Sequence, residues 1–288
     1  MRDWLRRSAS VVVAGLMTSG AAASSFDDES DLGKLRTQLL RAEQAEEREA
    51  ALRAIALTPA DEKGVPSRDA AKLLARGLMD EAMSVRVEAV RLLGMAAHRE
   101  VALLALIDVL ESTRTEMGRL SNAAARGQAN KDDERIVALI DENVRFARGV
   151  IEALGHLPDD RSVKTLSNFS EKIPTGLRGR FAETLARSLV RLGTRSAWQE
   201  VIRMLPSLEA RAGRGVPLPL AKAGKKAKTS PLQKVHDVLV GAADVAELDR
   251  APEFGDTPAA QWRKWYERHQ RRFPARLGRI DPAIPDDG

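Results

Sequence analysis

Three segments of the chain repeat one pattern of apolar and polar positions. They begin at Val85, Phe146 and Phe181, with apolar or small residues at offsets 0, 4, 5 and 8 and mainly polar residues at offsets 2 and 6. This spacing places the apolar residues on one face of an α-helix. Because such a helix must bury that face against a neighbour, the repetition predicts stacked helices. We expect these residues to be buried: Val85, Ala89, Leu93, Phe146, Val150, Leu154, Phe181, Leu185 and Leu189.

The periodicity predicts an all-α chain with about five pairs of helices. The expected pairs are 32–42 with 46–57, 68–79 with 85–97, 100–111 with a helix beginning near residue 143, 160–172 with 177–192, and 196–208 with 232–243. Ser84 is predicted to cap the helix 85–97, because a serine side chain can accept from the free backbone N–H groups of a helix start.

The intervals between repeats indicate two insertions. The starts at Phe146 and Phe181 are 35 residues apart, as in a two-helix repeat, whereas Val85 and Phe146 are 61 apart. We interpret the polar stretch 112–133 as an insertion that protrudes from the array. A second insertion, 210–229, is rich in Gly, Pro and Lys, which predicts a flexible loop.

The pattern resembles the HEAT repeat family, including its bacterial PBS-lyase-like variants. The resemblance rests on Ser84-Val85-Arg86 with Leu93-Gly94, and on Glu152-Ala153-Leu154-Gly155 followed by residues 158–163. The copy at Phe181 departs from it, with Val190 where the glycine would stand, and the first and fifth copies are degenerate. Over residues 31–245 the resemblance implies a right-handed α-solenoid, a HEAT-like superhelix that binds other molecules; it implies no chemistry.

The C-terminal segment 253–280 is predicted to form a Trp-rich, basic helix and tail that cap the solenoid. Residues 253–256 with 262–265 resemble a tail that follows HEAT-like arrays in exported bacterial proteins. Trp262, Trp265, Tyr266, His269 and Phe273 share one face of a helix, so we expect a buried aromatic stripe with the basic residues in water.

Residues 1–23 have the layout of a secretory signal peptide. A basic start precedes an apolar stretch, 9–17, and small residues lead to Ala23. We predict cleavage after Ala23, an acidic disordered linker 24–30, and a soluble periplasmic or secreted chain. The apolar stretch is too short to span a bilayer, so no transmembrane segment is expected in the mature chain. A retained anchor and an ordinary apolar helix remain alternatives.

No motif predicts catalysis, a metal or a cofactor. The chain has no cysteine, which excludes disulfides and thiolate zinc sites. The histidines lack metal-ligand spacing, and residues 224–229 depart from a phosphate-binding loop. Asp132, Asp133, Asp159 and Asp160 precede predicted helices, where carboxylates stabilise the helix dipole. We therefore predict a protein that is not an enzyme.

The leading functional prediction is a non-enzymatic scaffold that binds a protein partner through the polar offsets 2 and 6. These positions are four residues apart, so they share a helix face and align between stacked helices. The candidate protein-binding residues are Arg53, Arg91, Arg148, Glu152, Glu183 and Arg187, with Val87 and Glu49 completing the rows. The competing interpretation is ordinary charge pairing on a solvated face.

The alternative prediction is binding to an anionic envelope polymer, such as lipopolysaccharide or an acidic polysaccharide. Residues 210–228 contain six basic residues and no acid, and 262–279 contain seven basic residues and one acid. Such segments attract polyanions in a salt-dependent way. The candidate residues are Arg211, Arg214, Lys222, Lys225, Lys226, Lys228, Arg263 and Arg268. Folding of the basic segments onto the acidic remainder competes with this prediction, and export argues against a nucleic-acid partner.

Overall fold

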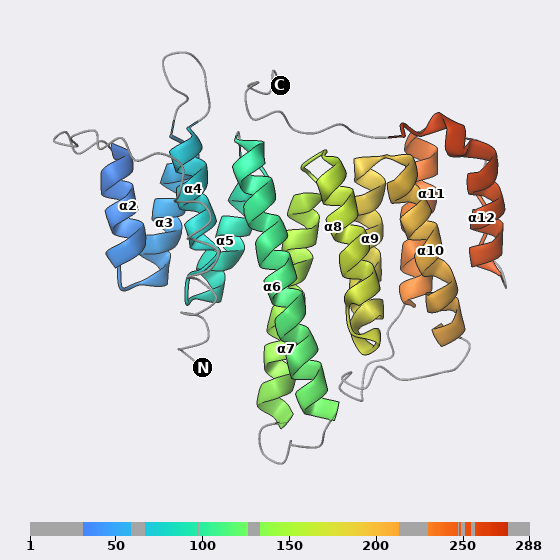
Figure 1. Cartoon of the computed structure of the whole chain (residues 1–288), viewed down its shortest axis with the longest axis horizontal. Coiled ribbons are helices and arrows are strands. Elements are labelled where there is room, and N and C mark those ends of the chain that lie inside the picture. Colours follow the sequence, from blue (N-terminus) through green and yellow to red (C-terminus); the bar gives the residue numbers. More distant parts are fainter. Residues whose placement is uncertain are drawn as a thin grey trace. The chain divides into compact units, whose positions relative to one another are not determined.

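The computed structural model describes residues 31–58, 67–96, 98–125, 133–212, 230–246, 248, 251–254 and 257–275. Regular structure in these ranges is entirely helical, with eleven α-helices and two short 3₁₀ helices, which confirms the all-α prediction (Figure 1). None of these helices is both long and apolar enough to cross a membrane. The predicted signal peptide 1–23 and linker 24–30 lie outside the described residues.

The chain divides into two compact units between Val109 and Leu110. The first unit contains α2 (Asp31–Arg41), α3 (Ala45–Ala56), α4 (Arg68–Gly77), α5 (Met83–Leu93) and the beginning of α6 (Arg99–Ala125). Helix α3 packs against α2, α4 and α5, and α2 also contacts α4. Consecutive helices run in opposite directions, so α3 and α5 point the same way (Figure 1).

A buried arginine ties two connections of the first unit together. Arg48 Nε and Nη2 donate to the two carboxylate oxygens of Asp80 at 2.8 and 2.9 Å. Its Nη1 donates to the carbonyls of Ala42 and Glu43, both at 2.9 Å. The connection before α3 is thereby fixed to the turn before α5.

The prediction that Ser84 caps α5 is wrong. The helix begins at Met83, its N-cap is Ala82, and no side chain caps it there. Asp80 Oδ1 instead accepts from the Ala82 N–H at 2.8 Å, so the carboxylate that binds Arg48 also shapes the turn. Ser84 is exposed inside the helix. The helix also ends at Leu93, earlier than the expected residue 97.

The second unit arranges its helices in two rows. It contains the end of α6, then α7 (Asp133–Leu154), α8 (Asp160–Lys172), η1 (Thr175–Leu177), α9 (Arg178–Leu192), α10 (Arg195–Ala212), α11 (Pro231–Val245), α12 (Pro258–His269) and η2 (Gln270–Arg272). Helix α9 lies between α7 and α11, whereas α10 contacts α8 and α12. Cross-contacts of α9 with α8 and α10 hold the rows together. Alternate helices thus share a row, which brings their equivalent positions together.

The core includes the residues that the periodicity selected. Val85, Ala89, Leu93, Phe146, Val150, Leu154, Phe181, Leu185 and Leu189 are all buried, as expected.

The close approach of α7 to α9 depends on a glycine, which has no side chain. A Cβ on Gly155, at the end of α7, would lie 2.8 Å from Ser188 Cβ and 2.9 Å from its Cα. The glycine of the Ala-Leu-Gly motif therefore lets α7 end directly against α9.

The predicted insertion 112–133 is mostly helix. Helix α6 continues through Ala125, and α7 begins at Asp133 instead of near residue 143. The reason is a sparse apolar stripe: Leu110, Met117 and Leu120 on α6 and Ile140 on α7 are buried. Polar residues between them obscured this stripe in the sequence. The second predicted insertion, 210–229, overlaps the end of α10 at residues 210–212, and residues 213–229 lie outside the described ranges.

Candidate functional site

The predicted polar rows become a charge network in the first unit. Arg53 on α3 and Arg91 on α5 both bind Glu88, with Arg53 Nε and Arg91 Nη2 lying 2.8 and 2.7 Å from Glu88 Oε1. Hydrogen bonds from Arg91, and then from Arg53, lower the pKa of Glu88 to about 2. The arginine side chains are 54% and 53% exposed, whereas Glu88 is 12% exposed. Arg53 Nη2 also lies 3.0 Å from Glu49 Oε2, so the surface presents two half-exposed guanidinium groups above two largely covered carboxylates.

An apolar groove begins one helical turn beyond these arginines. Leu57 follows Arg53 by four residues and Met95 follows Arg91 by four, and their exposed fractions are 82% and 65%. The groove has a volume of about 500 Å³ and is lined by Arg53, Ile55, Ala56, Leu57, Thr58, Ser67, Ala70, Ala71, Leu74, Arg91, Leu92, Met95, Ala96 and His98. Large exposed apolar side chains gathered in one place are typical of an interaction surface.

A histidine supplies a polar group within this groove. His98 Nδ1 is buried and has no hydrogen-bond partner among the residues that the structure describes. A buried polar atom without a partner costs free energy, and a ligand group that bonded to it would recover that cost. Neither the sequence pattern nor the spacing of the histidines indicated this role, since His98 belongs to no motif.

In the second unit three of the four predicted residues bind side chains of the protein itself. Glu183 on α9 accepts from Arg187 Nη2 at 3.0 Å and from Lys234 Nζ of α11 at 2.9 Å. The pKa of Glu183 is lowered, chiefly by the hydrogen bond from Lys234. Arg148 Nε on α7 donates to the Thr184 hydroxyl at 3.0 Å. These bonds connect α7 with α9 and α9 with α11.

Glu152 stands apart from this network. It is exposed on α7 and forms no ion pair with any residue that the structure describes. One turn later, the His156 ring lies 2.8 Å from Arg191 Nη1 of α9. Burial and the nearby Arg191 charge lower the pKa of His156. The Arg187–Glu183 pair is i,i+4 charge pairing within α9, which is the competing interpretation of these residues.

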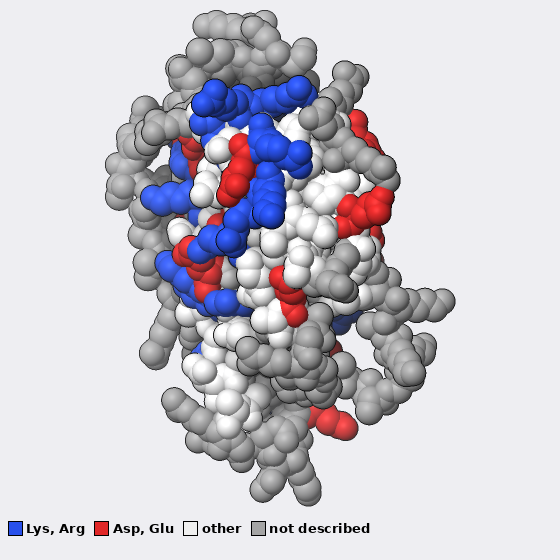
Figure 2. All heavy atoms as spheres, turned by 90° about the vertical axis from the view of Figure 1, so that its right-hand side faces the viewer, with Lys and Arg blue, Asp and Glu red and all other residues white. Residues whose placement is uncertain are grey.

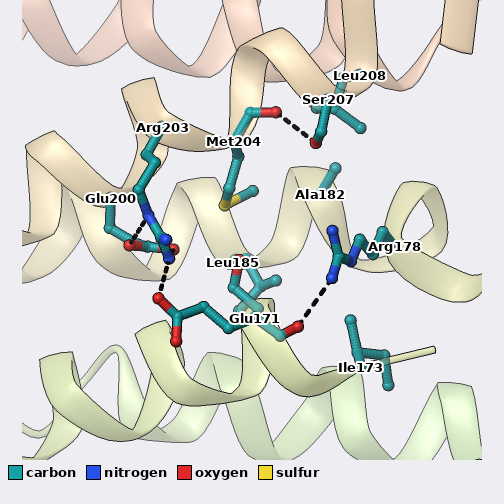
Figure 3. Close-up of a pocket in the computed structure, with 11 residues that line it drawn as sticks. Glu171, Ile173, Arg178, Ala182, Leu185, Glu200, Arg203, Met204, Ser207 and Leu208 are labelled. Atoms are coloured by element: carbon teal, nitrogen blue, oxygen red, sulfur yellow. Dashed lines mark hydrogen bonds and ion pairs between the residues drawn. The ribbon is translucent and has the colours of Figure 1, made fainter. Parts of the chain in front are cut away.

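A small pocket lies between α8, α9 and α10 (Figure 3). Arg203 Nε and Nη2 donate to the two oxygens of Glu200 at 2.9 Å, and Nη2 also lies 2.5 Å from Glu171. Arg178 Nη2 donates to the Glu171 carbonyl at 2.8 Å. The cavity measures about 190 Å³, below the roughly 300–1,000 Å³ of most ligand sites. Arg178 Nε has no hydrogen-bond partner among the described residues, but Arg203, Glu200 and Glu171 bind one another and the cavity is small, so we assign it no ligand.

The acidic pairs behave as helix caps where the structure describes them. Asp159 accepts from the Arg161 backbone N–H at 2.7 Å and from its side chain at 2.9 Å, at the start of α8. Asp133 begins α7, whereas Asp132 lies outside the described residues. In the described part of the chain, no three or more His, Asp or Glu side chains gather in a group that could hold a metal ion.

The predicted polyanion-binding residues divide into two groups. Arg214, Lys222, Lys225, Lys226 and Lys228 lie outside the described ranges, and of Arg211 only the backbone, at the end of α10, is described. Arg263 and Arg268 are exposed on α12, as are Lys264 on the same helix and Arg271 and Arg272 on η2. Figure 2 shows Lys and Arg side chains gathered on the side of the molecule where α12 lies.

Comparison with known proteins yields no match: no protein-family model, curated protein or solved structure corresponds to this chain. The resemblance to HEAT repeats therefore stays a prediction, and the fold that can be stated is an all-helical one whose helices pack in rows.

Proposed function

We propose that the chain is a non-enzymatic, exported scaffold that binds a protein partner through the groove between α3, α4 and α5. In this proposal the two helical units belong to one right-handed α-solenoid of the HEAT type, with α12 as its C-terminal cap. Export to the periplasm or beyond follows from the predicted signal peptide. The single observation that carries the binding function is the exposed pair Leu57 and Met95 beside Arg53 and Arg91.

The groove specifies the chemistry of its partner. Leu57 and Met95 favour an apolar side chain, because its burial removes apolar area from water. The half-exposed guanidinium groups of Arg53 and Arg91 favour a carboxylate about one helical turn away. Arginine is also enriched in the energetically important centres of protein interfaces. We therefore propose a peptide segment of another protein that carries an acidic residue close to a large apolar one.

The paired charges in the second unit are assigned a structural role in this proposal. Glu183 is shared between Arg187 and Lys234, and Arg148 bonds to Thr184. These interactions join neighbouring helices, and breaking them to bind a partner would cost the charge-assisted hydrogen bonds. Arg53 and Arg91 are also paired with carboxylates, but of the six predicted protein-binding residues they are the two that line the groove beside Leu57 and Met95, so they remain the binding candidates.

Site-specific photocrosslinking in the native host tests this function. A photoreactive amino acid at position 95 should give an adduct with a discrete protein, and the attached peptide should carry an acidic residue next to an apolar one. Arg91→Glu in the same chain should abolish the adduct, because the new carboxylate repels that of the partner. Arg187→Glu is the matched control, since it also replaces a half-exposed paired arginine.

Two outcomes would overturn the proposal. Adducts that persist in both Arg91→Glu and Leu57→Ser would show that position 95 is labelled by random encounter. Loss of the adduct in Arg187→Glu to the same degree would return the binding function to the whole polar row.

A further inference from the structure

The outward face of α12 carries a cluster of cations that form no ion pair with a carboxylate among the described residues. Five basic residues of α12 and η2 are exposed, and Glu267 is the single acid among them: Arg263, Lys264, Arg268, Arg271 and Arg272. None of the five forms an ion pair with a residue that the structure describes. Arg53, Arg91, Arg187 and Lys234, in contrast, are all bound to carboxylates.

The inward face of α12 is fixed by aromatic packing. Trp262 and Trp265 are fully buried, with ring centroids 5.2 Å apart. Trp262 Nε1 donates to His236 Nδ1 of α11 at 2.9 Å, and the Tyr266 hydroxyl donates to the Arg195 carbonyl of α10, also at 2.9 Å. Phe273 stacks on Trp198 with centroids 4.7 Å apart. This packing confirms the buried stripe and holds the cationic face in one orientation.

The backbone that follows α12 is held as well. The Arg195 N–H donates to the Pro274 carbonyl at 2.8 Å, and Arg195 Nε donates to the Gln270 carbonyl at 3.0 Å. These bonds fix η2, which carries Arg271 and Arg272. The charged platform is therefore preorganised, and a ligand would not have to order the helix when it binds.

The spacing of the cations suits an elongated ligand. Lys264, Arg268 and Arg271 fall at i, i+4 and i+7, so they follow one line along the helix. At 1.5 Å per residue this line is roughly 10 Å long. Four of the five cations are arginines, whose planar guanidinium groups bind carboxylate, sulfate or phosphate in a bidentate manner.

The same face lacks the features that bilayers and single-stranded nucleic acids require. A helix that lies in a membrane surface inserts apolar side chains, and single-stranded nucleic acids stack their bases on exposed aromatic rings. The aromatic residues of α12 and η2 that the structure describes are buried, namely Trp262, Trp265 and Tyr266. The face therefore offers charge without stacking or insertion.

We propose that the outward face of α12 and η2 binds a linear acidic polysaccharide, with Lys264, Arg268 and Arg271 as the central contacts and Arg263 and Arg272 beside them. The proposal is independent of the groove at Met95 and fits an exported chain, which would meet such polymers. Binding is electrostatic, so it weakens as salt screens the charges.

Retention of the purified protein on immobilised heparin and alginate, measured over a range of salt, tests this proposal. Replacing Lys264, Arg268 and Arg271 together by glutamine should weaken binding about tenfold or more at low salt and reduce the salt slope by roughly one per cation removed. The matched control replaces Arg119 on α6, Arg187 and Lys234 by glutamine. It removes the same charge from cations that are paired with carboxylates, and it should change binding less than about twofold. Tryptophan fluorescence verifies that α12 remains packed in both variants.

Several results would overturn the assignment. Equal weakening in the control would show that net charge alone drives retention. Loss of retention on deletion of residues 210–228, with the α12 variant unchanged, would move the site to that basic stretch. Tighter binding to anionic vesicles or to single-stranded DNA than to both polysaccharides would replace the proposed ligand. Equal binding to neutral dextran would show that the charge of the polysaccharide is not recognised.

Discussion

The guanidinium of Arg48 and the carboxylate of Asp80 form a bidentate ion pair across 32 residues of sequence, with side chains only 9% and 11% exposed. The hydrogen bond to Asp80 is the main cause of a raised pKa for Arg48. Because the same arginine binds the carbonyls of Ala42 and Glu43, it joins three parts of the first unit.

Removing Arg48 should therefore destabilise the first unit strongly. Arg48→Met leaves the carboxylate of Asp80 covered and unpaired, which typically costs about 3–5 kcal/mol of unfolding free energy. Arg187→Met, at an exposed pair, should cost less than about 1 kcal/mol. Urea unfolding followed by circular dichroism compares them, and equal losses would contradict a structural role for the Arg48 pair.

The two glycines Gly155 and Gly118 should respond in opposite ways to alanine. At Gly155 the added Cβ would meet Ser188 at 2.8 Å, so Gly155→Ala should separate α7 from α9 and lower the stability. We expect a loss of about 1–3 kcal/mol, as for other overpacked sites. Gly118 lies within α6, and a Cβ added there would have no other atom within 4 Å. Gly118→Ala should therefore raise the free energy of unfolding by roughly 0.5–1 kcal/mol. Thermal unfolding of both variants decides the comparison.

Truncating the core at Leu154 should be costly. This residue is completely buried at the end of α7. Leu154→Ala should lower the free energy of unfolding by about 2–5 kcal/mol through lost burial and a remaining cavity. Chemical denaturation measures the loss. A loss below about 1 kcal/mol, close to what substitutions at exposed sites cause, would mean that the packing at Leu154 is loose.

Glu88 should make the first unit sensitive to acid. Its pKa falls from the ordinary value of 4.5 to about 2 on folding, mainly through the hydrogen bonds from Arg91. The stabilisation is complete above pH 4.5 and is lost as the pH falls towards 2. Because the arginine ends are half-exposed, we expect about 1–3 kcal/mol. Glu88→Gln should remove that part of the acid dependence, and Glu152→Gln, on an exposed carboxylate, should not. Unfolding measured between neutral and acid pH distinguishes them.

The hydrogen bond from Trp262 to His236 should be visible in a histidine titration. Burial lowers the pKa of His236 below its ordinary 6.5, so the neutral ring is the form that accepts at Nδ1. The stability that this arrangement supplies is present above pH 6.5 and declines as the pH falls below it. Trp262→Phe removes the donor and should cost about 1–3 kcal/mol. NMR titration of His236 checks the pKa, and a value above 6.5 would contradict burial as its cause.

Much of the core was predictable from the sequence, because a helical period of 3.6 assigns each residue to a face without reference to the fold. The burial of Val85, Leu154 and Leu189 follows from this period alone. The aromatic face of α12 was predictable for the same reason. The helical period did not identify the buried Met117 and Leu120, because the apolar residues of this stripe are few and the polar stretches around them resemble an insertion.

The candidate sites were predictable only in part. The alignment of Arg53, Arg91 and Arg148 with neighbouring helices followed from their offsets. Their partners did not, because Glu88 lies outside the polar offsets and its pairing with Arg53 spans 35 residues. The exposed Leu57 and Met95 are apolar, so composition alone assigns them to the core.

What the sequence by itself determined is local: the helical state, the inward face of each helix and the segments that carry charge, since all three depend on residue type and spacing along one chain. Tertiary structure alone decided which charges are neutralised. Lys234 and Arg268 are both exposed helix cations in the sequence pattern, yet Lys234 of α11 meets Glu183 of the neighbouring α9, whereas no carboxylate among the described residues forms an ion pair with Arg268. The physical reason is that an ion pair requires two side chains within about 4 Å, a distance that packing between helices sets.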